Sequence, residues 1–496
     1  MAADRVHYAA ESGCATPIEA PKSGSLTSGP APGGGGEDSP RRHVPPTVQV
    51  SSSELLDPLG RFPDMISRLL RAAVAASLAG LVLTLSAAAA PGDLDPSFSG
   101  NGWLRTYELR GESAPYRPQG AEDVEIQPDG KIVAVGDMMG GDSYSAFGVF
   151  RYTPGGELDS SFGRGGWTAT EVGTFEHAHA LALQRDGKIV LAGEADCFFG
   201  CFGLVRYKPN GALDPSFGEG GVVRTAFPRL CGCHYMAVEV QPDGRIVAAG
   251  RVYNRFGQVF AVARYLPDGR LDRTFSGDGF VSISFGNSYE GVEALALQPD
   301  GKILVAGGGG RDYDFALARF RANGTLDRTF SRNGLVTVSF GRGRWDAAHA
   351  LALQRDGRIV AAGGSSAGQI GPSRIALLRL TRKGALDRSF GAGGRRLTKP
   401  VPFGGYAKAV LVLPDGRILV AGLAFEARDG ISSDWALARY TSTGRLDRSF
   451  GGDGIVISSF GTGADWAGAL ALQADGKIIA AGEIYRDQAV ARYLTH

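Results

Sequence analysis

The chain contains 496 residues with a formal net charge of +1, and 43% of its residues are hydrophobic. This balance excludes the strongly basic surface with which proteins hold nucleic acid, so we expect no nucleic-acid partner. Glycine accounts for 74 residues, which is about twice its usual share of ~7% and predicts a fold with many tight turns.

Residues 1–64 are rich in Pro, Gly and Ser and include the run Gly33–Gly36. Such a segment cannot bury enough apolar surface to offset the entropy lost on ordering, so we predict disorder there. Residues 65–90 begin with Met65, continue through a basic stretch into an apolar stretch, and end in small residues. This order is typical of a secretory signal peptide.

A signal peptide stands at the start of a protein, which favours Met65 as the first residue and predicts that 1–64 are not translated. The alternative is an uncleaved anchor, because Ala72–Ala90 spans 19 residues, barely enough to cross a bilayer. No cysteine follows the apolar stretch directly, which argues against a lipid anchor. Both alternatives export the rest of the chain, which we expect to be secreted or on the exterior of the cell envelope, with membrane contact only if the segment is uncleaved.

Residues 91–496 repeat one pattern seven times. Each copy opens with a phrase such as Leu94-Asp95-Pro96-Ser97-Phe98, and the opening leucines are Leu94, Leu158, Leu213, Leu271, Leu326, Leu386 and Leu446. The spacing is therefore 55 to 64 residues. Repeats of this length made only of strand-like pieces predict the blades of a seven-bladed β-propeller, an all-β fold.

The copy around residues 294–340 predicts four antiparallel strands, innermost first. Residues 294–298 and 302–307 are apolar and flank the turn Pro299-Asp300-Gly301, which predicts a hairpin near the axis. Residues 315–320 and 335–340 then form the third and outer strands. The chain starts with an outer strand in 94–106 and ends with a third strand in 489–493, so we expect these two to pair and close the ring.

Two polar residues recur in every copy. An arginine stands in the third strand, at Arg151, Arg206, Arg264, Arg319, Arg379, Arg439 and Arg492, and an aspartate in the opening phrase, at Asp95, Asp159, Asp214, Asp272, Asp327, Asp387 and Asp447. Seven catalytic sites in one chain are implausible. We interpret the aspartates as turn formers and the arginines as their partners, or as donors to carbonyl groups within or between blades. The alternative is a ring of repeated ligand sites.

The whole pattern, G-x-L-D-x-S-F-G-x-x-G followed by L-Q-P-D-G-K-I-x-x-A-G and A-L-A-R-Y, resembles the delta-60 repeat family, found mostly in exported bacterial proteins. The resemblance covers residues 94–493. It implies a propeller, and it implies no particular activity.

Candidate ligand residues lie in two kinds of loop, between second and third strands and between blades, which emerge on the same face. These loops vary between copies and are rich in aromatic and charged residues. The candidates are His177, His179, Tyr289, Glu290, Trp345, Asp346, Tyr406, Trp435, Asp465 and Trp466. Aromatic side chains beside carboxylates suit sugars or peptides, although the same aromatics could simply cover the core.

No catalytic motif is present, and we expect no cofactor. His177 and His179 could point the same way from an extended segment, but no third ligand stands in register, so we predict no metal site there. The leading hypothesis is an exported, monomeric, non-catalytic scaffold that binds a protein or glycan. The alternative is an extracellular propeller enzyme of the carbohydrate hydrolase or lactonase type, using carboxylates such as Asp346 and Asp465. A purely structural envelope component is a third hypothesis.

Four cysteines follow the signal segment, in two neighbouring loops. They are Cys197, Cys201, Cys231 and Cys233. An even, clustered set in an exported protein predicts disulfides, and pairing across the loops is favoured because a bridge between Cys231 and Cys233 would be strained. A zinc site of four thiolates, with His234 nearby, is the alternative.

Mass mapping of the exported protein without reduction tests the disulfides. We expect peptides containing Cys197 or Cys201 to be linked to the peptide containing Cys231 and Cys233. Four free thiols would contradict this prediction, and stoichiometric zinc in the native protein would favour the thiolate site instead.

Overall fold

The computed structural model describes residues 89–107, 116–140, 145–173, 176–195, 201–227, 231–254, 257–286, 289–368, 373–427, 432–461 and 463–495. The predictions for residues 1–64 and for nearly all of the signal segment lie outside this part of the chain. Within it, no helix is long and apolar enough to cross a membrane.

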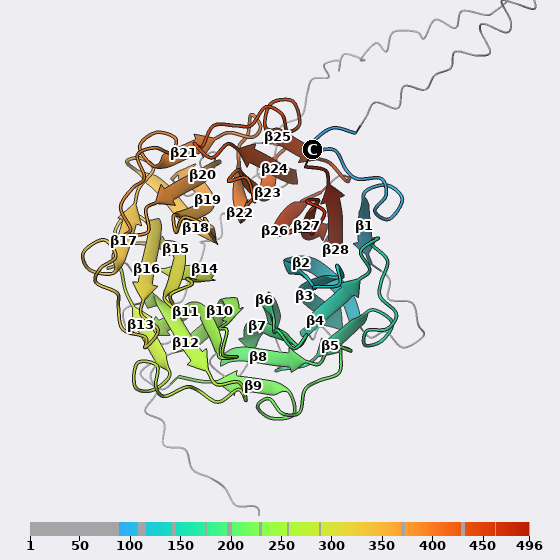
Figure 1. The fold of residues 1–496 in the computed structure, drawn as a ribbon, viewed down its shortest axis with the longest axis vertical. Coiled ribbons are helices and arrows are strands. Elements are labelled where there is room, and N and C mark those ends of the chain that lie inside the picture. Colours follow the sequence, from blue (N-terminus) through green and yellow to red (C-terminus); the bar gives the residue numbers. More distant parts are fainter. Residues whose placement is uncertain are drawn as a thin grey trace, which may run out of the picture. The chain divides into compact units, whose positions relative to one another are not determined.

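Seven four-stranded antiparallel sheets surround a central axis, as the sequence predicts (Figure 1). Each sheet is one blade. Blade one holds β2 (Tyr116–Ile126), β3 (Ile132–Gly140), β4 (Ser145–Tyr152) and β5 (Trp167–Thr170). Blade two holds β6 (His177–Leu183), β7 (Ile189–Ala195), β8 (Cys201–Tyr207) and β9 (Val222–Thr225). Blade three holds β10 (Cys231–Val240), β11 (Ile246–Asn254), β12 (Gly257–Tyr265) and β13 (Phe280–Ile283).

The remaining blades follow the same order. Blade four holds β14 (Gly291–Leu297), β15 (Ile303–Gly309), β16 (Asp314–Phe320) and β17 (Leu335–Val338). Blade five holds β18 (Arg344–Leu353), β19 (Ile359–Ala367), β20 (Ser373–Leu380) and β21 (Arg395–Thr398). Blade six holds β22 (Gly405–Val412), β23 (Ile418–Phe425), β24 (Ser433–Tyr440) and β25 (Ile455–Ser458). Blade seven holds β26 (Trp466–Leu472), β27 (Ile478–Ile484), β28 (Asp487–Tyr493) and β1 (Trp103–Thr106).

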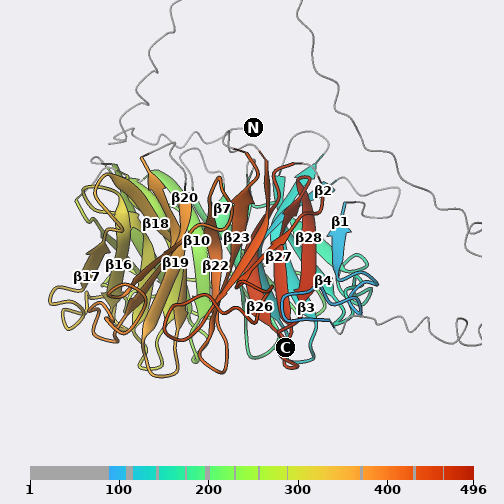
Figure 2. The same ribbon diagram turned by 90° about the horizontal axis from the view of Figure 1, so that it is seen from above.

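Blade seven joins the two ends of the chain. β1 pairs antiparallel with β28, with Trp103 opposite Ala491 and Thr106 opposite Gln488. The predicted closure is therefore confirmed. In the side view the strands run between two faces formed by the loops (Figure 2).

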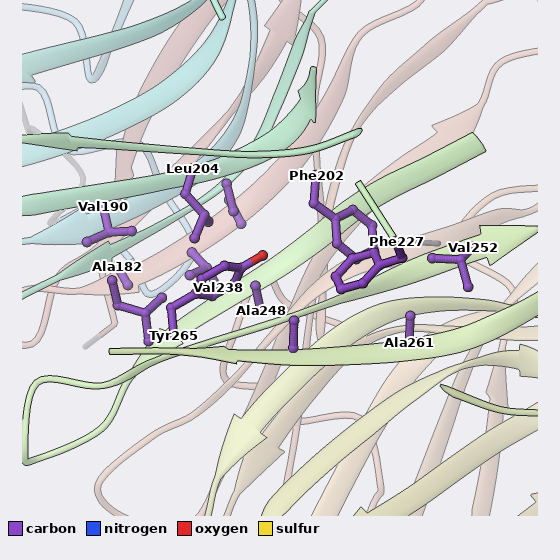
Figure 3. Close-up of a cluster of buried hydrophobic side chains, with 14 of the residues drawn as sticks. Ala182, Val190, Phe202, Leu204, Phe227, Val238, Ala248, Val252, Ala261 and Tyr265 are labelled. Atoms are coloured by element: carbon purple, nitrogen blue, oxygen red, sulfur yellow. The ribbon is translucent and has the colours of Figure 1, made fainter. Parts of the chain in front are cut away.

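The hydrophobic core is divided among the seams between blades. Seven clusters of buried side chains each combine residues of two neighbouring blades. Figure 3 shows the seam between blades two and three, where Phe202 and Leu204 pack with Val238, Ala248 and Tyr265. A blade on its own would expose both apolar faces to water, so each blade depends on its neighbours.

The repeated arginines clamp neighbouring blades together. In blade one, Arg151 Nε lies 2.8 Å from Asp159 Oδ2, and Nη1 donates to the carbonyl oxygen of Pro209 in blade two. Its guanidinium group also lies 4.5 Å from the centre of the Phe162 ring. All seven arginines form this ion pair. The predicted pairing is confirmed, within blades to aspartate and between blades to carbonyl groups.

The last clamp closes the ring. Arg492 Nε lies 2.8 Å from Asp95 Oδ2, and its Nη1 donates to the carbonyl oxygen of Pro154 at 2.7 Å. Tyr152 adds a second link, because its hydroxyl contacts Thr106 Oγ1 at 2.7 Å and accepts from Gln488 Nε2 at 2.8 Å. Blades seven and one are therefore joined by buried polar contacts as well as by apolar packing.

Replacing the closing clamp should destabilise the whole ring. We expect Arg492→Gln to lower the free energy of unfolding by about 2 kcal/mol, because it removes one of the two cations that pair with the buried Asp95 carboxylate and the donor to the Pro154 carbonyl group, while Lys477 keeps the second ion pair. The matched control is Arg270→Gln, whose exposed pair with Asp268 should contribute less than about 0.5 kcal/mol. Chemical denaturation of both variants measures the difference. Equal effects would contradict the clamp's role in closure.

Candidate functional site

The two faces of the ring differ in sequence. One end of the ring carries the loops that connect second strands to third strands and each blade to the next, and we call this end the variable face. The Asp-Gly turns and the repeated opening phrases lie at the other end. Seven large apolar side chains are exposed among the described residues, and six of them lie on loops or strand ends of the variable face: Tyr107, Met139, Tyr289, Trp345, Phe403 and Tyr485. The seventh, Ile457, lies on the outer strand β25. The sequence-predicted face therefore carries an apolar rim.

Three of the predicted ligand residues are exposed on this face. Tyr289 is 66% exposed and Trp345 is 39% exposed. Trp345 packs against Tyr313, with ring centres 5.3 Å apart. His177 is exposed at the start of β6, and its Nδ1 lies 2.6 Å from Asp137 Oδ2 of blade one. These three side chains can reach a ligand directly.

Four other predicted residues lie inside the protein and not on the ligand face. Glu290, Asp346 and Asp465 are fully buried, and their carboxylates accept backbone N–H groups of Phe285, Phe340 and Tyr485 respectively. Trp435 is also fully buried, and its Nε1 donates to the carbonyl oxygen of Glu483. The carboxylates hold loop backbone in place because buried N–H groups need partners. Asp346 and Asp465 thus have a structural role and do not form an acid–base pair at the axis.

Polar residues occupy one repeated position near the axis in five of the seven blades. A β-bulge interrupts the pairing of every innermost strand at the same place in the repeat. The bulged residue differs from blade to blade. We call these residues the axial ring: Glu122, His179, Met236, Glu293, His349, Lys408 and Gly468.

The repeated glycine in the second strand makes the bulge possible. A Cβ atom at Gly363 would collide with the carbonyl oxygen of Ala347, and one at Gly193 would collide with that of His177. Only glycine permits the inner strand to come this close. This glycine, which follows an alanine in six blades and Val135 in blade one, thus allows the bulge that positions the axial ring.

Lys408 and Glu122 meet across the axial side of blade seven. The Lys408 Nζ atom lies 3.9 Å from Glu122 Oε2 and 3.6 Å from the centre of the Trp466 ring. The two residues come from blades six and one, so their side chains must extend toward the axis to meet. Both are partly exposed, at 30% and 33%, so solvent reaches this pair.

The Trp466 indole ring packs closely against the backbone of two glycines, Gly120 and Gly468. A Cβ atom at Gly468 would collide with the ring, and one at Gly120 would come within 3.2 Å of Trp466 Cζ2 and 2.8 Å of Glu483 Cβ. The ring and the Glu483 side chain therefore lie side by side over the seam between blades seven and one.

Carboxylates of the axial ring are shifted toward the neutral form. Loss of hydration raises the pKa of Glu293 to about 7, with Glu122 adding to the shift and Arg251 and Lys408 opposing it. The pKa values of Glu122 and Glu483 are raised for the same main reason. The cause is physical, since burial removes water from a carboxylate and so favours its neutral form.

The two axial histidines stay neutral. Burial lowers the pKa of both His179 and His349 to about 4, and Lys408 adds to the effect at His349. Tyr406 packs against His349 with ring centres 5.5 Å apart. Neutral imidazole groups both donate and accept hydrogen bonds, so these residues can serve a polar ligand without adding charge.

A second tier of carboxyl groups lies further along the inner strands. Asp123 Oδ2 accepts the N–H group of Leu181 at 2.9 Å, and Glu125 Oε2 accepts that of Leu183 at 3.1 Å. Burial raises the pKa of Asp123 to about 6 and that of Glu125 to about 8. These groups bond backbone of blade two, so we assign them a structural role.

Histidine–carboxylate pairs link blades one, two and three. His234 Nδ1 lies 2.6 Å from Glu194 Oε2, which matches the pair formed by His177 and Asp137 one blade earlier. In the described part of the chain, no three His, Cys, Asp or Glu side chains are grouped so as to hold a metal ion. Cys197 and the side chains of Cys201, Cys231 and Cys233 lie outside the described residues, so the disulfide prediction stays untested.

Sequence reasoning identified His179, Tyr406 and Trp466 but missed Glu122, Glu293, His349 and Lys408. Their position in the repeat could have identified these four residues. Each axial residue stands five positions before the residue that follows the inner strand, which is Gln in six blades and Leu413 in blade six. The flanking positions are mostly small and constant, whereas this position changes among Glu, His, Met, Lys and Gly.

Comparison with known proteins supports the fold. A family model described as "Domain of unknown function (DUF5122) beta-propeller" matches residues 127–162, 184–217, 241–275, 298–330, 354–390, 413–450 and 473–495. No curated protein matches the chain. This finding places the repeats in a propeller repeat family without assigning chemistry.

Several solved structures are similar at low identity. A streptogramin B lyase is 12% identical with a TM-score of 0.45, over 78% of this chain and 96% of its own. A Dyadobacter fermentans protein of unknown function is 12% identical with a TM-score of 0.40, over 80% and 98%. A polysaccharide lyase that acts on ulvan is 10% identical with a TM-score of 0.41, over 77% and 95%. These likenesses carry no argument about function.

Glu293 should make the protein less stable as pH rises. Its folded pKa of about 7 exceeds the ordinary value of 4.5, so the folded state keeps a proton that the unfolded state loses between these pH values. We expect Glu293→Gln to raise the free energy of unfolding by about 1–3 kcal/mol at pH 8 and to leave it nearly unchanged at pH 4. Denaturation at both pH values measures this, with the exposed Glu219→Gln as control. A Glu293→Gln effect that does not depend on pH would contradict it.

Proposed function

Since this chain carries seven repeats of a β-propeller repeat family, we propose that it is a binding scaffold that presents its variable face to a protein or glycan partner. The observation that carries the proposal is the apolar rim. Six of the seven large apolar side chains exposed among the described residues lie on this face, although solvation would favour their burial.

The composition of the rim supports binding. Tyrosine and tryptophan supply large, rigid contact area and are enriched at binding hot spots. Trp345 rests on Tyr313, which restricts its motion, and Tyr107 lies beside the Arg105 guanidinium at 4.6 Å from the ring centre. Preorganised aromatic side chains lose little entropy when a partner binds.

We also propose that the protein is exported. The basis is the signal-like segment 65–90 and the four clustered cysteines that follow it. A secreted propeller meets peptides and glycans outside the cell, which agrees with an aromatic binding face.

An extracellular propeller enzyme is the second candidate. The observation that favours it is the axial ring, where Glu293 has a pKa of about 7 and could exchange a proton near neutral pH. An enzyme would use Glu122 or Glu293, and not the loop-holding Asp346 and Asp465.

Rim substitutions test the scaffold function. Glycan arrays and partner capture with the wild-type protein should identify a ligand, and Tyr289→Ala with Trp345→Ala should weaken its binding at least about tenfold. Arg270→Ala is the control, because Arg270 is 77% exposed in the turn between β12 and β13, at the end of the ring opposite the variable face. Undiminished binding by the rim variant, or equal loss in the control, would refute the proposal.

A further inference from the structure

The two histidine–carboxylate pairs occupy the same place in successive blades. His177 stands at the start of the inner strand β6, and its Nδ1 atom lies 2.6 Å from Asp137 Oδ2 on β3 of blade one. His234 on β10 contacts Glu194 Oε2 on β7 of blade two at the same distance. In both pairs the carboxylate residue directly follows the repeated glycine of the second strand. Each pair therefore links the inner strand of one blade to the second strand of the blade before it.

The other five seams hold different residues at these two positions. In no case is a histidine placed opposite a carboxylate. The residues that meet are Arg251 with Gly291, Gly308 with Ala347, Gly364 with Tyr406, Leu423 with Trp466, and Glu483 with Gly120. A contact of this kind is therefore confined to the seams on either side of blade two.

The Asp137 carboxylate contacts β6 through both of its oxygen atoms. Oδ2 pairs with the His177 imidazole, and Oδ1 accepts the N–H group of Ala178 at 2.8 Å. The His177 side chain is 51% exposed and that of Asp137 is 19% exposed, so the imidazole exchanges protons with solvent while the carboxylate is largely shielded. A protonated imidazole makes this hydrogen bond charge-assisted, and such bonds are about twice as strong as neutral ones. Proton uptake by His177 therefore strengthens the contact between β3 and β6.

Other titratable groups surround His177 on the neighbouring strands. Glu194 lies opposite it in the pairing of β6 with β7, and His234 of β10 pairs with Glu194 in turn. Glu122 of β2 is near enough to act on the charge of the imidazole. His179 of β6 stacks on the same ring, with ring centres 6.1 Å apart. Carboxylates thus approach His177 from three strands of blades one and two.

These surroundings favour the charged form of His177. The hydrogen bond with Asp137, aided by the charges of Asp137, Glu194 and Glu122, raises the pKa of His177 above its ordinary value of 6.5, although burial opposes the shift. The stacked His179 stays neutral at this pH, because burial lowers its pKa to about 4. His177 is thus the member of the stacked pair whose charge changes near neutral pH.

We propose that the seam between blades one and two is a pH-sensitive latch, in which protonated His177 holds β6 firmly to Asp137 of β3 and neutral His177 holds it more weakly. The folded state keeps a proton on His177 that the unfolded chain loses near pH 6.5. The contribution of the latch is therefore fully present below that pH and is lost as the pH rises through the folded pKa. The inference goes beyond the proposed binding function and does not depend on it.

NMR titration of the imidazole signals of the full chain tests the change of charge. We expect the His177 midpoint to lie above pH 6.5 and Asp137→Asn to lower it by at least about 0.5 pH unit, because the carboxylate partner is lost. Asp268→Asn is the matched control, since Asp268 forms an exposed pair with Arg270 and its loss should leave the His177 midpoint unchanged. A wild-type midpoint at or below 6.5, or equal shifts in the two variants, would overturn the latch.

Hydrogen exchange of β6 measures the strength of the latch itself. In the wild-type protein, we expect the protection of amide groups in residues 176–183, corrected for the intrinsic exchange rate, to fall at least about threefold from pH 5.5 to pH 8.5. His177→Gln keeps a hydrogen-bond donor but cannot take up a proton, so its protection should not change over this range. Constant protection in the wild-type protein, or an equal fall in His177→Gln, would refute the proposal. The wild-type NMR midpoint and exchange profile remain decisive even if a variant is unstable.

Discussion

Closure of the ring is the constraint on which the rest of this structure depends. Each blade is apolar on both faces, so it can leave water only by packing between two neighbours, and the first and last blades must also meet. At each seam an arginine also pairs with an aspartate of its own blade and donates to a carbonyl group of the next blade, so polar contacts join the same neighbours as the apolar packing. The clamp gives partners to buried charges within and between blades, and this explains why Arg and Asp recur in every blade.

The blades share the same bulge in the inner strand but differ in the residue that occupies it. The bulge and the repeated glycine fix one residue per blade at the axis, and the repeat leaves the identity of that residue free. Structural needs would be met by alanine at this position. The presence of Glu122, Glu293, His349 and Lys408 instead costs hydration free energy, visible in the shifted pKa values of the carboxyl and imidazole groups.

The rim and the axis carry different kinds of side chain. Exposed aromatic side chains such as Tyr289 and Trp345 lie on the rim, whereas carboxyl groups, Lys408 and the Trp466 ring lie at the axis. Both sets of side chains are carried by strands that the closure of the ring holds together.

The sequence by itself determined the number of blades, the order of strands, the pairing of β1 with β28 and the partnership of arginine with aspartate. These follow from period, turn residues and alternation, which are local properties repeated seven times. Only the tertiary structure decided which loop residues are exposed and which are buried. Trp435, Asp346 and Asp465 have the composition of a binding site, yet they are buried, whereas Lys408 and Glu122 meet although 286 residues separate them. The physical reason is that a loop carboxylate becomes buried where the folded loop brings unpaired backbone N–H groups to it, and that Lys408 meets Glu122 only when blades six, seven and one pack together.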